Sequence, residues 1–201
     1  MGNQWLHRPS TWLGSPASRR SQYVQHRFRK LQLTLNGRCA DNSVYIIHEM
    51  GNTVTQHTIT PLSSGVTVTP QVANVSILPP NLPANSKMGA AELLYASSPT
   101  PLLYASNRNI TVDPKNIGDG DTITILSTAP ALKPVGFVKT GLAQIRAMAF
   151  LGDNDRFLLA AGLLGGGIKV YERVSEEQGW LKEVAKLNDG RILQPTSFVS
   201  V

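Results

Sequence analysis

The sequence of 201 residues contains one cysteine, Cys39, so no intramolecular disulfide can form and a reducing compartment is favoured. It also contains no apolar run near the roughly 18 residues that a membrane-spanning helix needs. Its first residues lack the apolar core of a secretory signal. These absences predict a cytoplasmic protein without a membrane partner.

Acidic residues are missing from the start of the chain. Residues 1–30 carry six basic residues and no Asp or Glu, whereas the remainder has 13 basic and 13 acidic residues. The near-neutral body gives no electrostatic reason to expect a nucleic-acid partner. We therefore interpret residues 1–28 as a basic, disordered segment ahead of a folded part at 29–201. The Arg- and Ser-rich composition of this segment also fits a mitochondrial transit peptide, and that alternative stays open.

A repeat dominates the body of the sequence, which is rich in Val, Ile and Thr and has frequent Gly and Pro. An apolar strand followed by a turn and a second strand pattern recurs about every 55 to 60 residues. Each recurrence contains four short strand patterns, which is the size of one propeller blade. The recurring apolar strands are 44–48, 102–106 and 157–161, and the first of them is followed by predicted strands at 53–59 and 72–78.

The repeats predict an all-β fold, a β-propeller with three four-stranded blades. These blades are predicted at 29–80, 88–140 and 143–187, and a last short strand follows at 195–200. In a closed propeller such a terminal strand completes a blade that begins elsewhere in the chain. Because propellers usually have four to eight blades, three blades predict a partial ring.

Two irregularities interrupt the repeat. An insert from Ile110 to Gly120 separates the second and third strands of the second blade. A Gly-rich turn from Leu163 to Gly167 stands in the third blade where the other blades have polar residues. The run Gly165-Gly166-Gly167 is no phosphate loop, because it lacks the GK[ST] ending and a following helix.

Charged residues recur at matched positions of the repeat. The first strands of propeller blades line the central channel, and the alignment places Arg29, Glu92 and Arg146 at equivalent points of those strands. The ends of the second strands bring in Glu49 and Arg108. Arginines converging on a channel suit an anionic ligand, since guanidinium groups bind carboxylate or phosphate in a bidentate manner. A glutamate among them stays ionised and can act as a base or position a water molecule.

Two neighbours of these charges are further candidates for substrate binding. His48 precedes Glu49, and Asn107 precedes Arg108. For each residue of the set the alternative is a solvated strand end. The four histidines have no metal-ligand spacing, so we expect neither a metal ion nor a cofactor.

Several segments, in this order and spacing, resemble the lactonase-type seven-bladed β-propellers, which include bacterial 6-phosphogluconolactonase and fungal carboxy-cis,cis-muconate cyclase. The final segment is similar to the carboxyl end of fungal members. The segments that carry the resemblance are Val44 to Glu49 with Gly51 to Thr55, Ile77 to Pro79, Ala90 to Leu93, Leu103 to Arg108, Arg156 to Ala161, Ile168 to Tyr171, and Pro195 to Val199.

The resemblance covers about residues 29–201 and implies the carboxyl-terminal half of a seven-bladed ring. It implies action on a lactone or its open-chain acid, by hydrolysis as in 6-phosphogluconolactonase or by ring closure as in the muconate cyclase. It assigns catalytic roles to Arg29, Glu49 and Arg108, with Glu92 and Arg146 as polar channel positions. The partner would be an anionic small molecule.

A function that is not enzymatic stays open as an alternative. A partial ring exposes blade faces and strand edges, which are prone to association. The chain is then a non-catalytic propeller fragment that serves as a binding module, and it self-associates through its open blade edges.

Overall fold

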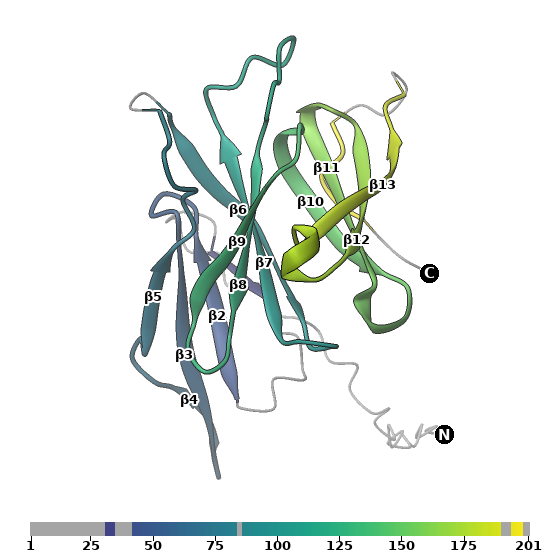
Figure 1. Ribbon diagram of the computed structural model, residues 1–201. Helices are drawn as coiled ribbons and strands as arrows, with labels where there is room; N and C mark the ends of the chain where they lie inside the picture. Colours follow the sequence, from purple (N-terminus) through teal and green to yellow (C-terminus); the bar gives the residue numbers. More distant parts are fainter. Residues whose placement is uncertain (1–30, 35–41, 84–85, 190–193, 199–201) are drawn as a thin grey trace, which may run out of the picture.

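The computed structural model describes residues 31–34, 42–83, 86–189 and 194–198, which form three antiparallel sheets in chain order (Figure 1). We call these sheets the first, second and third blades. Two short 3-10 turns, Asp153–Asp155 and Glu176–Gln178, accompany them. Among the described residues no helix is long and apolar enough to span a membrane.

The second and third blades are regular four-stranded meanders, in which each strand pairs with the next along the chain. The second blade consists of β6 (Met88–Ala96), β7 (Leu102–Asn109), β8 (Thr122–Ser127) and β9 (Lys133–Lys139). The third consists of β10 (Ala143–Leu151), β11 (Phe157–Gly165), β12 (Ile168–Arg173) and β13 (Leu181–Leu187). The middle strands of the second blade, β7 and β8, are buried on both faces.

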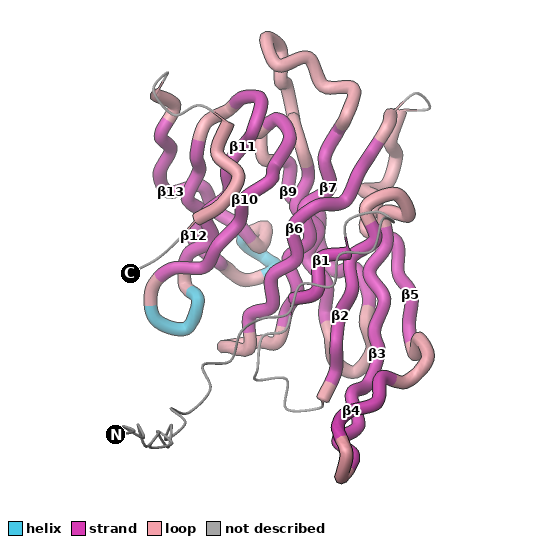
Figure 2. The backbone as a smooth tube through the Cα atoms, turned by 180° about the vertical axis from the view of Figure 1, so that it is seen from behind, coloured by secondary structure: helices cyan, strands magenta, loops and turns pink. Residues whose placement is uncertain are grey.

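The first blade carries an addition to this plan. It consists of β1 (Leu31–Thr34), β2 (Ser43–His48), β3 (Thr53–Leu62), β4 (Gly65–Val68) and β5 (Ala73–Ser76). β5 pairs with the first half of β3, at residues 53–56, and β4 pairs with the second half, at 59–62. The second half of β3 and β4 therefore form a hairpin that extends beyond the blade (Figures 1 and 2).

The prediction of a partial propeller with three blades is confirmed. The sequence did not reveal the hairpin, because the predicted third strand ended at Ile59 and the next began at residue 72. The predicted closing strand at 195–200 is not seen: residues 194–198 form no strand, and 199–201 lie outside the described residues. The physical reason is that each sheet takes all its strands, five in the first and four in each of the others, from one continuous stretch of chain, so none of the three lacks a strand.

The core consists of two apolar clusters, one between each pair of adjacent blades. Burying one large apolar side chain stabilises the fold by roughly 1.5–3 kcal/mol. Between the first and second blades the fully buried members include Ile47, Val54, Leu93 and Leu103. Between the second and third blades they include Ile123, Ile125, Ile145 and Leu158.

The two irregularities of the sequence meet in the structure. The insert of the second blade folds against the Gly-rich turn of the third, and a Cβ atom at Gly165 would lie only 2.8 Å from Ile117 Cδ1. A side chain at 165 would therefore require the Ile117 side chain of the insert to move. The insert thus joins the second blade to the third at the end where β7 and β11 terminate.

Candidate functional site

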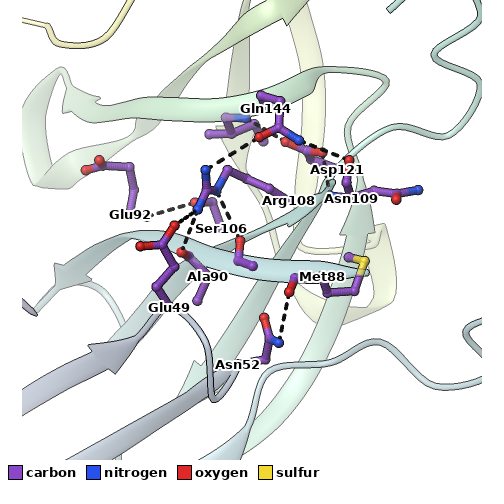
Figure 3. A network of polar contacts seen from close by, with 12 residues as sticks. Glu49, Asn52, Met88, Ala90, Glu92, Ser106, Arg108, Asn109, Asp121 and Gln144 are labelled. Atoms are coloured by element: carbon purple, nitrogen blue, oxygen red, sulfur yellow. Dashed lines mark hydrogen bonds and ion pairs between the residues drawn. The ribbon is translucent and has the colours of Figure 1, made fainter. Parts of the chain in front are cut away.

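In the first and second blades the end of the second strand places a charged residue at the junction with the next blade. Glu49 directly follows β2 and faces the second blade, where its Oε1 accepts a hydrogen bond from Arg108 Nη2 in an ion pair (Figure 3). The Glu49 carbonyl accepts a further hydrogen bond from Ala90 N at 3.1 Å. The predicted pair of second-strand charges is thus brought together across the first blade junction.

Arg108 is buried and almost fully engaged. Its side chain is 4% exposed, against 31% for Glu49. Besides the ion pair, Nε donates to Gly89 O at 3.2 Å, Nη2 to Ala90 O at 3.3 Å, and Nη1 to Gln144 Oε1 at 3.5 Å. Because a guanidinium has five N–H groups, four contacts leave one for a ligand.

β-bulges bring in the other two predicted charges. In β6 the pairing with β7 shifts between Ala90 and Leu93, and Glu92 N donates to Ser106 Oγ at 2.9 Å. In β10 the pairing with β11 shifts between Ile145 and Ala147, at Arg146. Bulges redirect side chains and occur often beside active sites.

The pairing register of the first and second strands shows that Glu92 and Arg146 are not at the same position of the repeat, whereas the sequence alignment predicts the same position. Ala91 and Glu92 together lie opposite Ser106, whereas Arg146 and Ala147 lie opposite Ala161, so Glu92 and Arg146 stand one residue apart in the repeat. Arg29 lies outside the described residues. In the first blade Gln32 pairs with Ile47, the position that matches Ser106.

Four predicted residues line one small cavity at the inner edges of the three blades. Its wall is completed by apolar side chains. The lining residues are Ile47, Glu49, Ala90, Ala91, Glu92, Arg108 and Arg146.

Arg146 differs from Arg108 within this cavity. Its Nε is buried and makes no hydrogen bond, and no ion pair to Arg146 occurs within the described ranges. A buried, unpaired donor costs about 1–3 kcal/mol, which a ligand that accepts its hydrogen bond would offset. The cavity therefore holds one engaged cation and one cation with donors to offer.

The structure does not bring His48 or Asn107 to the cavity. His48 lies on the opposite face of β2 from Ile47, with its Nε2 2.9 Å from Thr55 Oγ1. Burial, followed by the nearby His57, lowers the pKa of His48. Asn107 is fully buried and donates from Nδ2 to Ile77 O at 3.2 Å. Both side chains support the first blade and its contact with the second.

Two residues at the second blade junction escaped the sequence reasoning. Asp121 is fully buried, and its carboxylate accepts hydrogen bonds from Asn109 N at 2.8 Å and Ile145 N at 2.6 Å. Burial raises the pKa of Asp121 to about 6, against the opposing effects of these N–H groups and Arg108. Gln144 has a positive φ of 61° and donates from Nε2 to Asn109 O at 3.1 Å (Figure 3).

One signal for Asp121 was available in the sequence. Asp121 directly precedes the strand β8, in which apolar residues alternate with threonine. A carboxylate that enters such a buried strand must find buried partners. Gln144 gave no signal, because only the left-handed backbone turns its amide toward Arg108.

Comparisons with known proteins agree with this architecture. A family model described as Lactonase, 7-bladed beta-propeller, matches residues 29–192. No curated protein matches the sequence.

Solved structures give a similar result. The chain resembles the periplasmic gluconolactonase PpgL of Pseudomonas aeruginosa, with 17% identity, a TM-score of 0.59, and coverage of 84% of this chain and 40% of that one. Proteins provisionally named 6-phosphogluconolactonase resemble it too. One is from Bacteroides fragilis (22% identity, TM-score 0.58, 84% and 40% coverage). The other is from Bacteroides uniformis (25%, 0.53, 76% and 38%). The chain thus spans about 40% of the length of the structures it matches.

Proposed function

The chain belongs to the lactonase family of seven-bladed β-propellers, and we propose that its cavity binds and turns over a lactone or the corresponding open-chain acid. The observation that carries the proposal is the unpaired, buried Nε of Arg146 in a cavity that Glu49 also lines. A guanidinium with free donors beside a carboxylate offers an anion receptor and a proton acceptor within one small space.

Arg146 is proposed to hold the anionic part of the ligand. Its donors match the planar oxygens of a carboxylate or phosphate, and the apolar wall of Ala90 and Ala91 reduces competition from water. Arg108 has a different part, since four of its contacts are already made by protein groups. It acts as a positioning residue that fixes the carboxylate of Glu49.

Ring opening follows from this arrangement. Glu49 Oε1 accepts a hydrogen bond from Arg108, so Oε2 is left to act as the base. Oε2 takes a proton from a water molecule while the water oxygen attacks the lactone carbonyl carbon. The ester C–O bond then breaks, and the proton passes from Glu49 to the departing ring oxygen. The product is the open hydroxy acid.

Ring closure of a carboxylated muconate uses the same groups in another order. A carboxylate oxygen of the substrate forms a C–O bond at one carbon of the double bond while the carboxyl group of Glu49, carrying a proton, delivers it to the other carbon, and Arg146 holds a second carboxylate. Hydrolysis of 6-phosphogluconolactone and this lactonisation are therefore alternative reactions of one site, to be separated by substrate.

The second candidate function is a non-catalytic binding module. It is favoured by the four contacts that protein groups already make to Arg108 and by the span of the chain, which is about 40% of the matched structures. In that case the cavity binds an anion without turning it over.

Calorimetric titration with 6-phosphogluconate tests the proposal. Arg146→Met should weaken binding roughly 10- to 100-fold, because a hydrogen bond to a charged group contributes about 1.5–3 kcal/mol. Arg146→Lys should keep part of the affinity. Arg156→Met is the matched control, since Arg156 is an exposed arginine paired with Glu172. Equal affinity of wild type and Arg146→Met would contradict the proposal.

Turnover assays then separate the two candidates. The purified chain is tested for hydrolysis of 6-phosphogluconolactone above the spontaneous rate and for cyclisation of carboxymuconate. Turnover lost in Glu49→Gln supports the enzyme. Binding that depends on Arg146 without any turnover supports the binding module.

A further inference from the structure

The hairpin of residues 59–68, which we call the projecting hairpin, lies within a long segment that has no charged residues. From Met50 to Ser86 the sequence has no Asp, Glu, Lys or Arg. Natural sheets usually protect exposed edges with charged side chains or with proline on the edge strand. The edge strand β4, Gly65–Val68, has neither.

One face of the projecting hairpin is entirely apolar. Ile59 pairs with Val68 and Pro61 with Val66, so these four side chains share a face. Val66 is 67% exposed and Val68 is 53% exposed. A two-stranded hairpin with an uncovered apolar face is marginally stable by itself in water.

The free edge of β4 presents a defined set of hydrogen-bonding groups. Ile59 N donates to Asn42 O, away from β4, so Ile59 and Val68 form a non-hydrogen-bonded pair. Thr69 N donates to Thr58 O, so Thr69 and Thr67 turn their amides toward β3. The N–H and C=O groups of Val66 and Val68 therefore point outward, and no backbone hydrogen bond reaches them from the described part of the chain.

We propose that a second copy of this chain docks on this edge, with the two β4 strands antiparallel about a two-fold axis at Thr67. In this register Val66 of each copy lies opposite Val68 of the other, and the outward groups make four main-chain hydrogen bonds. Thr67 lies opposite its own copy, a cross-strand pairing that is favourable in sheets. The two apolar faces become continuous across a four-stranded sheet.

Three features select a second copy over other occupants. An uncharged strand meets no like-charge repulsion from its own copy, which an edge with lysine would suffer. Residues 50–86 contain no Trp, Tyr, Phe, Lys or Arg, so the hairpin lacks the groups that anchor proteins to lipid surfaces. Pro70, the next outward-facing position after Val68, has no backbone N–H. Only Val66 and Val68 therefore donate outward, which is the number that the proposed pairing of two β4 strands uses. The inference does not depend on the proposed function.

A cysteine cross-link tests the register directly. In a Cys39→Ser background, Thr67→Cys should form a disulfide-linked dimer under mild oxidant, because Cα atoms in a non-hydrogen-bonded pair are about 4.5 Å apart. Thr60→Cys is the matched control on the same face. It should not cross-link, since its two copies would stand three strand spacings apart, about 14 Å.

Sedimentation of the full chain gives the second readout. The wild-type mass should rise from monomer to dimer with concentration, as expected for a small interface. Val68→Pro should remain monomeric, because it removes an outward N–H that β3 does not use. A wild type that stays monomeric, a dimer that survives in Val68→Pro, or equal cross-linking of both cysteine variants would overturn the proposal. So would a monomer that binds phosphatidylcholine vesicles or another protein through this hairpin instead.

Discussion

The two blade junctions join neighbouring sheets with different chemistry. At the first junction the ion pair of Glu49 and Arg108 lies partly open, with Glu49 31% exposed. At the second junction the carboxylate of Asp121 is fully buried and receives two backbone N–H groups. The charges of the first junction border the small cavity, whereas the carboxylate of Asp121 is enclosed by the backbone N–H groups whose hydrogen bonds it accepts. We infer that Asp121 serves stability, and that the first junction with its bordering residue Arg146 can serve binding.

Removing the carboxylate of the second junction should have the largest effect. Asp121→Ala leaves the amides of Asn109 and Ile145 unpaired in the core, at about 1–3 kcal/mol each, so we expect a loss of about 2–6 kcal/mol in the free energy of unfolding. Urea denaturation measures it. Asp113→Ala is the control, because this exposed aspartate also accepts a backbone N–H, from Lys115. Equal losses in both variants would contradict the comparison.

The pH dependence of the unfolding free energy should also reveal the buried carboxylate of the second junction. The pKa of Asp121 is raised from 3.8 to about 6, so the folded state binds this proton more tightly than the unfolded chain. The contribution of Asp121 to stability is therefore most favourable below about pH 4 and declines as the pH rises to about 6, by about 3 kcal/mol. We expect Asp121→Asn to remove this slope from the pH dependence of the unfolding free energy. An unchanged slope would show that Asp121 titrates normally.

A smaller coupling is expected at the first junction. A double-mutant cycle with Glu49→Gln and Arg108→Met should give about 1–2 kcal/mol for the pair, because one partner is partly solvated. Arg108→Met alone should cost more than Glu49→Gln, since it also loses the contacts to Gly89, Ala90 and Gln144. Thermal or urea unfolding of the four proteins measures the coupling. Additive losses would mean that the ion pair contributes nothing.

The strands of the three blades were predictable because alternating apolar residues and turn signals recur with the repeat. The strand β4 was not, since Val66 to Val68 is too short to show a period and stands between turn residues. The insert and Gly165 were visible as irregularities, but the contact between them was not.

The candidate site was predictable in part. Glu49 and Arg108 follow from the alignment of second strands, because equivalent positions of adjacent blades face one another. His48 does not reach the cavity because adjacent residues of a strand point to opposite faces. The side chains of His48 and Glu49 are therefore on opposite sides of the sheet, although the residues are neighbours in the sequence. The difference between Arg108 and Arg146 depends on backbone carbonyls that no sequence pattern specifies.

The most direct test of the central claim measures the melting midpoint of Arg108→Met and Arg146→Met side by side, with and without 6-phosphogluconate. We expect Arg108→Met to melt below wild type without ligand, because its protein contacts are lost. Arg146→Met should melt no lower than wild type without ligand, because an unpaired buried donor is removed, and it should show no stabilisation when ligand is added. The reverse pattern, a destabilised Arg146→Met that still responds to ligand, would contradict the assignment of binding to Arg146.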